Sequence, residues 1–176
     1  MTKNVTKNMT NSTEIVERLV NVGRCVKVVK GGRNFSFSAI VVVGDRNGRV
    51  GYGLGKASEV IDAKSKASKE ARKNMIKIPL REARTLHHDV IGRFGSGKVV
   101  MRAAPSGTGM IAGGAIRALF DALGIKDLVA KSIGSNNPHN MIKAALEGLR
   151  KIKTPKLIAE KRGKKIGEIT SLRGKN

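Results

Sequence analysis

The chain of 176 residues carries 35 Lys and Arg against 13 Asp and Glu, so its formal net charge at pH 7 is +22. A folded domain with this charge repels itself, whereas a polyanion would neutralise it and release counterions on binding. An acidic membrane is the rival polyanion. However, there is no Trp, and the longest apolar run, residues 39–43, is far shorter than the ~20 residues that span a bilayer. The composition therefore favours a nucleic acid over a membrane as the partner.

The remaining composition points to a folded intracellular protein. An apolar content of 40% is enough for a packed core, and the length allows one or two small domains. The single cysteine, Cys25, excludes an intrachain disulfide and fits a reducing compartment. Residues 1–13 are polar, rich in Asn and Thr, and lack the apolar segment of a secretory signal. We therefore expect a short disordered extension there.

The first half predicts one helix, three strands and a second helix. Residues 14–20 favour a short helix with Thr13 as its N-cap. Strands are predicted over residues 24–30, 34–43 and 50–54, since apolar and polar side chains alternate in the last two. Asp45-Arg46-Asn47-Gly48 predicts a hairpin turn in which Asn and Gly supply positive φ angles. An apolar stripe of helical period predicts a helix over residues 58–76. The order α-β-β-β-α is that of a double-stranded-RNA-binding domain.

The second half predicts a smaller α/β unit. Two strands, over residues 86–93 and 98–103, are joined by Phe94-Gly95-Ser96-Gly97, and a Gly-rich loop leads to a helix over 115–123 that ends at Gly124. A strand over 129–133 follows, and Asn137 with Pro138 predicts the start of a helix that ends near residue 151. The order is β-β-α-β-α. We therefore expect an α+β fold with domains at 14–77 and 78–155, divided near Pro79, and a basic tail at 156–176 with room for one short helix.

One loop is the main candidate for phosphate binding. Lys27, Lys30 and Arg33 flank Gly31 and Gly32 in a segment without acidic residues. Glycine lets the backbone approach a phosphate closely, and the cations supply the charge. A solvated hairpin tip is the structural alternative, but the net charge of the chain favours contact with RNA.

The sequence patterns that suggest nucleotide binding or catalysis are incomplete. Residues 92–98 resemble a phosphate-binding loop, yet position 99 is Val rather than Ser or Thr, and the next residues favour a strand. A hairpin with one phosphate-facing lysine, Lys98, fits better. His87, His88 and His139 with Cys25 lack zinc-ligand spacing. No nucleophile, base and orienting group can be combined. We therefore expect no enzyme activity, no cofactor and no metal.

The Gly-rich segment at 107–114 has two open interpretations. The dinucleotide-binding pattern is broken, since position 112 is Ala. The helix N-terminus that follows could still hold an RNA phosphate or an acidic side chain of a partner. Close packing of the backbone at a protein interface explains the glycines equally well.

Three ordered motifs give the chain a family resemblance. Residues 30–39 read KGGRNFSFSA, residues 43–53 read VGDRNGRVGYG and are followed by GKA at 55–57, and the later landmarks are APSGTGMIAGG at 104–114 and KSIGSNNP at 131–138. This pattern resembles the small-subunit ribosomal protein family called S-five, in its bacterial type. The resemblance spans roughly residues 14–168.

The resemblance implies both a fold and a location. It implies an N-terminal domain of the double-stranded-RNA-binding type and a C-terminal α/β domain with a left-handed β-α-β crossover. It also implies a place between the head and body of the small subunit, beside the S-four and S-eight proteins and close to where mRNA enters. One departure stands out: Ser58, Glu59 and Asp62 occupy the helix start where double-stranded-RNA-binding domains place lysines. This makes clamping of a free RNA duplex doubtful.

The resemblance and the charge pattern together give the predicted site residues. The residues predicted to bind rRNA are Arg24, Lys27, Lys30, Gly31, Gly32, Arg33, Arg49, Lys56 and Lys98. By resemblance, the segment facing the S-four protein, at an interface tied to decoding accuracy, includes Gly107, Thr108, Gly109 and Arg117.

The leading hypothesis is a structural rRNA-binding protein of the small ribosomal subunit that stabilises the head relative to the body and supports accurate translation with the S-four protein. A free-standing regulator that binds double-stranded RNA and a nucleotide-dependent enzyme acting on RNA are the alternatives. The lysine-poor start of the 58–76 helix argues against the regulator, and Val99 argues against the enzyme. The expected location is the small ribosomal subunit in the cytoplasm, with an organellar ribosome as the open alternative.

Overall fold

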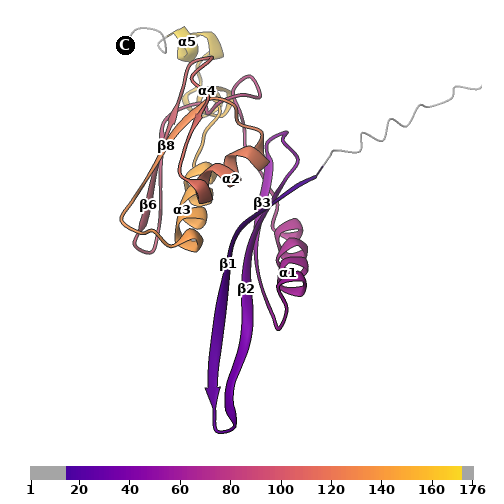
Figure 1. The fold of residues 1–176 in the computed structure, drawn as a ribbon. Helices are drawn as coiled ribbons and strands as arrows, with labels where there is room; N and C mark the ends of the chain where they lie inside the picture. The colour runs from indigo at the N-terminus through magenta and orange to yellow at the C-terminus, as the bar shows by residue number, and fades with distance from the viewer. Residues whose placement is uncertain (1–14, 172–176) are drawn as a thin grey trace, which may run out of the picture.

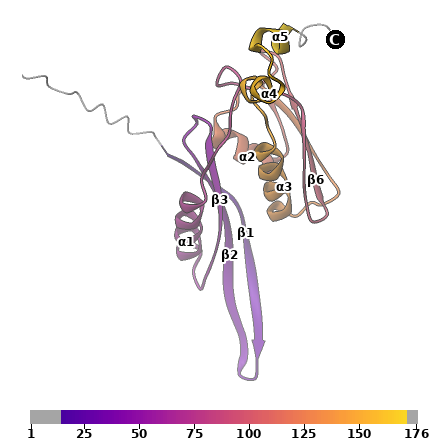
Figure 2. The same cartoon turned by 180° about the vertical axis from the view of Figure 1, so that it is seen from behind.

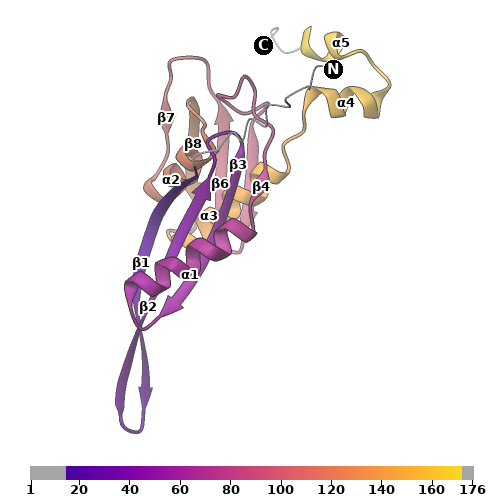
Figure 3. The same ribbon diagram turned by 90° about the vertical axis from the view of Figure 1, so that its right-hand side faces the viewer.

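The N-terminal half is a four-stranded antiparallel sheet with one helix on one face. A computed structural model describes residues 15–171. The strands follow in the order of the chain and are β1 (Val16–Val29), β2 (Gly32–Gly44), β3 (Arg49–Ala57) and β4 (Ile76–Lys77). Helix α1 (Val60–Lys73) crosses β2 and β3, while β1 and β2 continue beyond the helix as a two-stranded ribbon (Figures 1 and 3).

The expected helix at 14–20 is wrong, because β1 already begins at Val16. Thr13 and Glu14, like the extension expected at 1–13, lie outside the described residues. β1 pairs with β2 from Val16 opposite Gly44 to Val29 opposite Gly32, with one irregularity between Leu19 and Asn21. This long ladder satisfies the backbone of a segment rich in valine, so a non-local partner overrides the local helix signal.

Alternate glycines of β3 bring α1 unusually close to the sheet. A methyl group at Gly51, Gly53 or Gly55 would overlap the backbone carbonyl oxygens of Ala71, Ala67 and Ala63 respectively. These three alanines are fully buried. The alanines of α1 and the alternate glycines of β3 therefore face each other. Because both kinds of residue are small, the helix backbone packs directly on the backbone of the strand.

The C-terminal half contains a second four-stranded sheet, in the order β5-β6-β8-β7. Its elements are β5 (Val90–Phe94), β6 (Gly97–Ala103), β7 (Met110–Ile111), α2 (Gly114–Leu123), β8 (Leu128–Ile133) and α3 (Pro138–Arg150). β7 was not expected; it runs parallel to β8, to which α2 connects it. The handedness of this crossover stays a prediction. The first strand starts at Val90 rather than at residue 86, because its pairing with β6 begins only where Val90 lies opposite Met101. The preceding residues 81–85 form a turn closed by the Arg81–Thr85 bridge.

The expected helix ends in this half are confirmed. The side-chain oxygen of Asn137 accepts a hydrogen bond from the His139 N–H at 3.1 Å, with Pro138 in the first turn. Gly124 ends α2 in the left-handed conformation, with φ of 89°. The fold is α+β, as predicted.

One hydrophobic core joins the two halves. Val41 and Val43 of β2 point to α1, whereas Ile40 and Val42 belong to a cluster that also contains Phe120 of α2 and residues of α3. The 45–48 turn adds polar contacts, because the N–H groups of Arg46 and Gly48 donate to the carbonyls of Ala122 and Leu123 at 3.1 Å each. These carbonyls lie at the C-terminus of α2 and have no partner within the helix.

The turn itself has the expected position but a different geometry. Positive φ angles occur at Arg46 (53°) and Gly48 (91°), not at Asn47. Asp45 organises the turn, since its carboxylate accepts hydrogen bonds from the N–H groups of Asn47 at 2.8 Å and Arg49 at 2.9 Å.

The described part of the basic tail contains two short helices rather than one. They are α4 (Pro155–Arg162) and α5 (Ile166–Ser171). Figures 1 and 2 show them at one end of the molecule, with the tip of the β1–β2 hairpin at the other.

Glu17 fastens the start of β1 to α1. Its carboxylate accepts hydrogen bonds from Arg72 at 2.7 Å and from the Ser68 hydroxyl at 3.0 Å. The hydrogen bond from Arg72 is the main cause that lowers the pKa of Glu17 below its ordinary 4.5, against the opposing effect of burial. A lowered folded-state pKa stabilises the fold fully above the ordinary value, and this contribution is lost as the pH falls toward the folded-state value.

We therefore expect Glu17→Gln to lower the free energy of unfolding by up to about 1 kcal/mol at pH 7. The gap between wild type and variant should shrink as the pH is lowered below the ordinary Glu pKa of 4.5. Urea unfolding followed by circular dichroism between pH 7 and pH 4 measures it. A gap that stays constant with pH would show that Glu17 acts through packing and not through its charge.

Candidate nucleic-acid interface

The β1–β2 hairpin is an exposed basic feature of the described part of the chain. Residues 24–33 contain four cations and no carboxylate. Residues 26–35 are all exposed. This ribbon extends past α1 and past the rest of the sheet (Figures 1 and 3). The hairpin thus presents backbone and positive charge well outside the core.

The register distributes the cations over both faces of the ribbon. Val26 lies opposite Phe35 and Val28 opposite Arg33, whereas Lys27 lies opposite Asn34 on the alternate face. The Arg24 guanidinium stacks on the Phe35 ring, with its carbon 3.9 Å from the ring centroid. One face is therefore basic and apolar, and the other is basic and polar.

Exposed apolar side chains on the hairpin were not predicted as site residues. Val28 is 75% exposed and Phe35 is 48% exposed, which is unusual for valine and phenylalanine unless they meet a partner. Their alternation in the sequence looks like that of a strand with a buried face. The structure shows that the ribbon extends past α1, so that no other element of the described chain covers these two side chains.

The structure brings together only part of the predicted rRNA-binding set. Arg24, Lys27, Lys30, Gly31, Gly32 and Arg33 share the hairpin. Arg49 begins β3 beside Asp45, at the far end of β2 and roughly 40 Å from the hairpin tip. Lys56 lies opposite Ser38, between these extremes, and Lys98 belongs to β6 in the other half.

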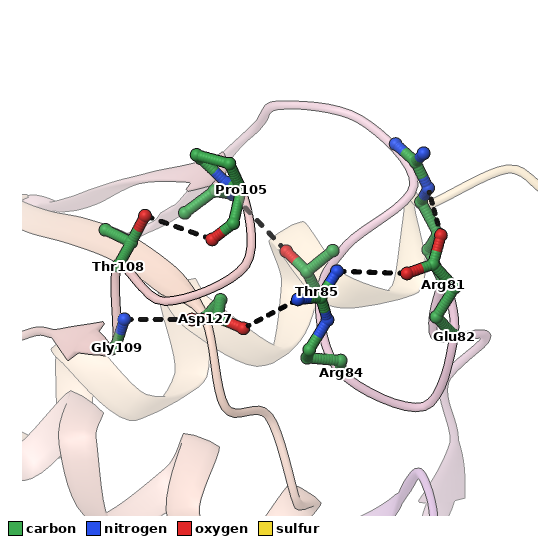
Figure 4. A network of polar contacts seen from close by, with 9 residues as sticks. Arg81, Glu82, Arg84, Thr85, Pro105, Thr108, Gly109 and Asp127 are labelled. Carbon is green, nitrogen blue, oxygen red and sulfur yellow. Dashed lines mark hydrogen bonds and ion pairs between the residues drawn. The ribbon is translucent and has the colours of Figure 1, made fainter.

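A network around buried Asp127 positions the predicted protein-interface segment (Figure 4). Asp127 is 5% exposed and accepts a hydrogen bond from the Gly109 N–H at 2.9 Å. Its second oxygen lies 3.5 Å from the Arg84 guanidinium. The Thr108 hydroxyl donates to the Pro105 carbonyl at 3.0 Å. Buried Asp127 therefore fixes the inner side of the loop, while Gly107 and Thr108 are exposed.

Arg117 lies on the first turn of α2, exposed beside this loop. Its N–H donates to the Gly113 carbonyl at 2.8 Å, which starts the helix. The side chain borders a hollow of about 320 Å³ together with Arg18 and Asp121, which form an ion pair of 2.8 Å with each other. Within residues 15–171 the guanidinium of Arg117 has no ion-pair partner, so its charge is available to another molecule.

The sequence that resembled a phosphate-binding loop is a β-hairpin. Phe94 pairs with Gly97, and a strand, not a helix, follows. Within the described chain, no three His, Cys, Asp or Glu side chains lie together as metal ligands. Also within these bounds, every helix is too short or too polar to cross a membrane.

Known proteins of one family match the chain over almost its whole length. Residues 15–79 match the family described as ribosomal protein S5, N-terminal domain, and residues 92–162 match ribosomal protein S5, C-terminal domain. The protein named small ribosomal subunit protein uS5 from Dinoroseobacter shibae is 59% identical over 156 residues, which cover 89% of this chain and 82% of the relative. Its namesake from Paramagnetospirillum magneticum is 58% identical over 161 residues, 92% of this chain and 77% of the relative.

A third relative with the same name, from Caulobacter vibrioides, is 58% identical over 161 residues, which are 92% of this chain and 80% of its own. Both halves of the fold and all the sequence motifs thus fall within one set of bacterial proteins, which are structural and not enzymatic. The chain belongs to the ribosomal protein S5 family of the bacterial small ribosomal subunit, as its motifs predicted.

Proposed function

We propose that this protein is a structural component of the cytoplasmic small ribosomal subunit and that its β1–β2 hairpin holds rRNA. The observation that carries the proposal is the hairpin itself: an exposed two-stranded ribbon with four cations and no carboxylate over residues 24–33. Phosphates pair with lysine and arginine, and exposed bases or sugars can pack on apolar side chains. A ribbon with both kinds of group suits irregular RNA better than a uniform duplex.

The two faces of the hairpin suggest insertion between RNA segments. Lys27 lies on one face and Arg33 on the other, so a single flat RNA surface could not reach both. Contact on both faces would tie two rRNA segments to one protein element. This is how we propose that the protein stabilises the head relative to the body. Lys56, which lies farther along the same sheet, would extend the contact, whereas Arg49 and Lys98 would need separate RNA segments.

The experiment that tests rRNA binding compares two RNAs over a range of salt. The refolded full chain should bind a small-subunit rRNA fragment at least about 1,000-fold more tightly than an unrelated duplex of equal length, as specific complexes do. Both affinities should fall with salt, because both include counterion release. Equal affinities would leave only non-specific attraction, and the protein would then fit the free-standing duplex-binding regulator.

We further propose that the loop at 107–109 and Arg117 form an interface with a neighbouring protein, identified by family resemblance as S-four. Support comes from the free guanidinium of Arg117 and from the loop that Asp127 fixes in place. A rigid loop next to an available charge is suited to a polar protein contact. Neighbours of the S-eight family and mRNA where it enters the subunit are further partners that the resemblance implies. We also propose that the chain is divided into two domains, at residues 14–77 and 78–155.

Loss of Arg117 should favour the closed, decoding-competent state of the subunit. A charge-assisted contact is worth about 1–3 kcal/mol, enough to shift a two-state equilibrium several-fold. We therefore expect Arg117→Ala to raise near-cognate misreading several-fold while small-subunit levels stay normal. A near-cognate reporter and a sucrose gradient from the same cells measure both. Arg102→Ala, an exposed arginine on β6, is the matched control.

A bulky residue at Gly109 should raise misreading as well, but it adds backbone strain. Gly109 has φ of 72°, and an added Cβ atom would meet no other atom within 4 Å, so the cost at the backbone is conformational, about 1–2 kcal/mol. Arg117→Ala is therefore the cleaner test. Wild-type error rates in both variants would remove this segment from the fidelity interface, and loss of subunits would assign it to folding or assembly.

A further inference from the structure

A basic cavity that none of the predicted site residues line opens between the two halves. Its volume is about 550 Å³, and it is bordered by β3, β4, the end of α1, β5 and α3. The residues that decide its chemistry are Tyr52, Phe94, Lys73, Lys143, Arg150 and Glu147. Tyr52 and Phe94 come from different sheets, so the folded arrangement of the two halves creates the site.

Two aromatic rings lie near the same lysine in this cavity. The Lys143 ammonium lies 4.5 Å from the centroid of the Phe94 ring and 6.0 Å from that of the Tyr52 ring. Phe94 is 37% exposed, although it is a large apolar side chain. Met75, Ile76 and Leu146 line the cavity between the charged groups. The lining therefore combines aromatic and aliphatic side chains with cations, and Lys143 lies near both rings.

The charges of the cavity favour an anion. Lys73, Lys143 and Arg150 contribute three positive charges against one negative charge from Glu147, which is a net charge of +2. The single carboxylate is already engaged, since Glu147 accepts a hydrogen bond from Arg150 at 2.9 Å. Exposed Lys73 adds charge at the end of α1.

We propose that this cavity binds an unpaired nucleotide of RNA, with its base against Phe94 or Tyr52 and its phosphates on Lys143 and Lys73. A nucleotide fits within 550 Å³, the lower middle of the range for ligand cavities. Flat aromatic walls suit a nucleobase, which stacks regardless of its identity. A paired base keeps its faces inside the duplex, so only an unpaired one can enter. The inference rests on the proposed RNA-binding function and assigns it a second contact, distinct from the hairpin.

Tyr52 makes the cavity observable in the intact protein. It is the only tyrosine, and there is no tryptophan, so the intrinsic fluorescence of the full chain comes from this wall alone. We expect a single-stranded uridine hexamer to quench this fluorescence in a saturable way. Phe94→Ala should weaken the affinity by about 5-fold or more, because one stacking partner is lost. Lys143→Ala should weaken it and lower the salt slope by about 0.7.

The control variants remove an apolar side chain and a cation from positions outside the cavity. Ile91→Ala removes an exposed apolar side chain of β5 that lies on the opposite face of the sheet from Phe94, and Lys131→Ala removes an exposed cation of β8; both should leave the quenching curve unchanged. A duplex of the same charge and free uridine monophosphate should each bind at least about 10-fold more weakly than the hexamer, since one lacks an open base and the other lacks the neighbouring phosphates. Circular dichroism checks that the variants fold.

Several results would overturn the inference. These are no quenching, equal loss of affinity in Ile91→Ala and Phe94→Ala, or equal quenching by the duplex. Stronger quenching by a hexaglutamate peptide would make the cavity a docking site for an acidic protein segment, and stronger quenching by the free monophosphate would make it a site for a small nucleotide. Binding of the rRNA fragment by the same protein distinguishes this inference from the proposed function. If the fragment binds and the hexamer does not, only the assignment of the cavity is wrong. If the fragment does not bind, the proposed rRNA-binding function is wrong.

Discussion

Gly53→Ala should lower the free energy of unfolding by about 3 kcal/mol, the upper end of the usual range for overpacking. The added methyl group would overlap the backbone carbonyl oxygen of Ala67, and a backbone cannot rotate away as a long side chain can. Helix α1 would have to move off the sheet along its whole length, because Gly51 and Gly55 hold its neighbouring turns in the same way. Urea unfolding followed by circular dichroism at 222 nm measures the change.

Gly31→Ala is the matched control for this prediction. A methyl group at Gly31 meets no other atom within 4 Å, and its φ angle is not in the left-handed region. Its effect should stay within about 0.5 kcal/mol, as for other exposed positions. If Gly53→Ala proved as mild as Gly31→Ala, α1 would have to lie farther from β3 than the structure places it.

Replacing Lys27, Lys30 and Arg33 together with Ala should flatten the salt dependence of rRNA binding. Each phosphate contact contributes about 0.9 to the slope of log K against log salt on duplex RNA or DNA, so three contacts contribute up to about three units. The affinity at low salt should fall correspondingly, by roughly 100-fold or more. Filter binding to a refolded small-subunit rRNA fragment, repeated at four or five salt concentrations, measures both quantities. Folding should be unaffected, because all three side chains are exposed.

A second triple variant of equal charge tests whether position matters. Lys64, Lys66 and Lys69 are exposed on α1, and their replacement with Ala removes the same number of charges. It should change the slope by less than one unit, since α1 is not part of the proposed contact. Equal slopes for the two triple variants would show that only net charge matters, and an unchanged slope in the hairpin variant would remove the hairpin from the binding surface.

Local periodicity predicted most elements, and non-local pairing caused the main error. Alternation over residues 34–43 gave β2, and Asn137 with Pro138 gave the start of α3, because these signals depend on neighbours in the chain. Residues 14–20 have no such local determinant of strand structure. The strand conformation of residues 16–19 is decided by pairing with residues 41–44, and that pairing is not visible in the segment itself.

Close packing and shared cavities were the least predictable features. The alternate glycines of β3 were visible in the sequence, but only the position of α1 shows why side chains are absent there. Tyr52 and Phe94 lie in different strands, and nothing in the sequence indicates that they border one cavity with Lys143. Likewise, the sequence shows that Arg49 and Lys98 are basic but not that they lie far from the hairpin.

Sedimentation is the measurement that tests the central claim most directly. The tagged full chain is expressed in bacterial cells, and the lysate is centrifuged through a sucrose gradient at high magnesium, which keeps ribosomal subunits intact. A structural protein of the small subunit should migrate almost entirely with small subunits and with the ribosomes that contain them, and it should stay there when the salt is raised moderately. A chain that remains at the top of the gradient, or that follows duplex RNA away from the subunits, would contradict the account.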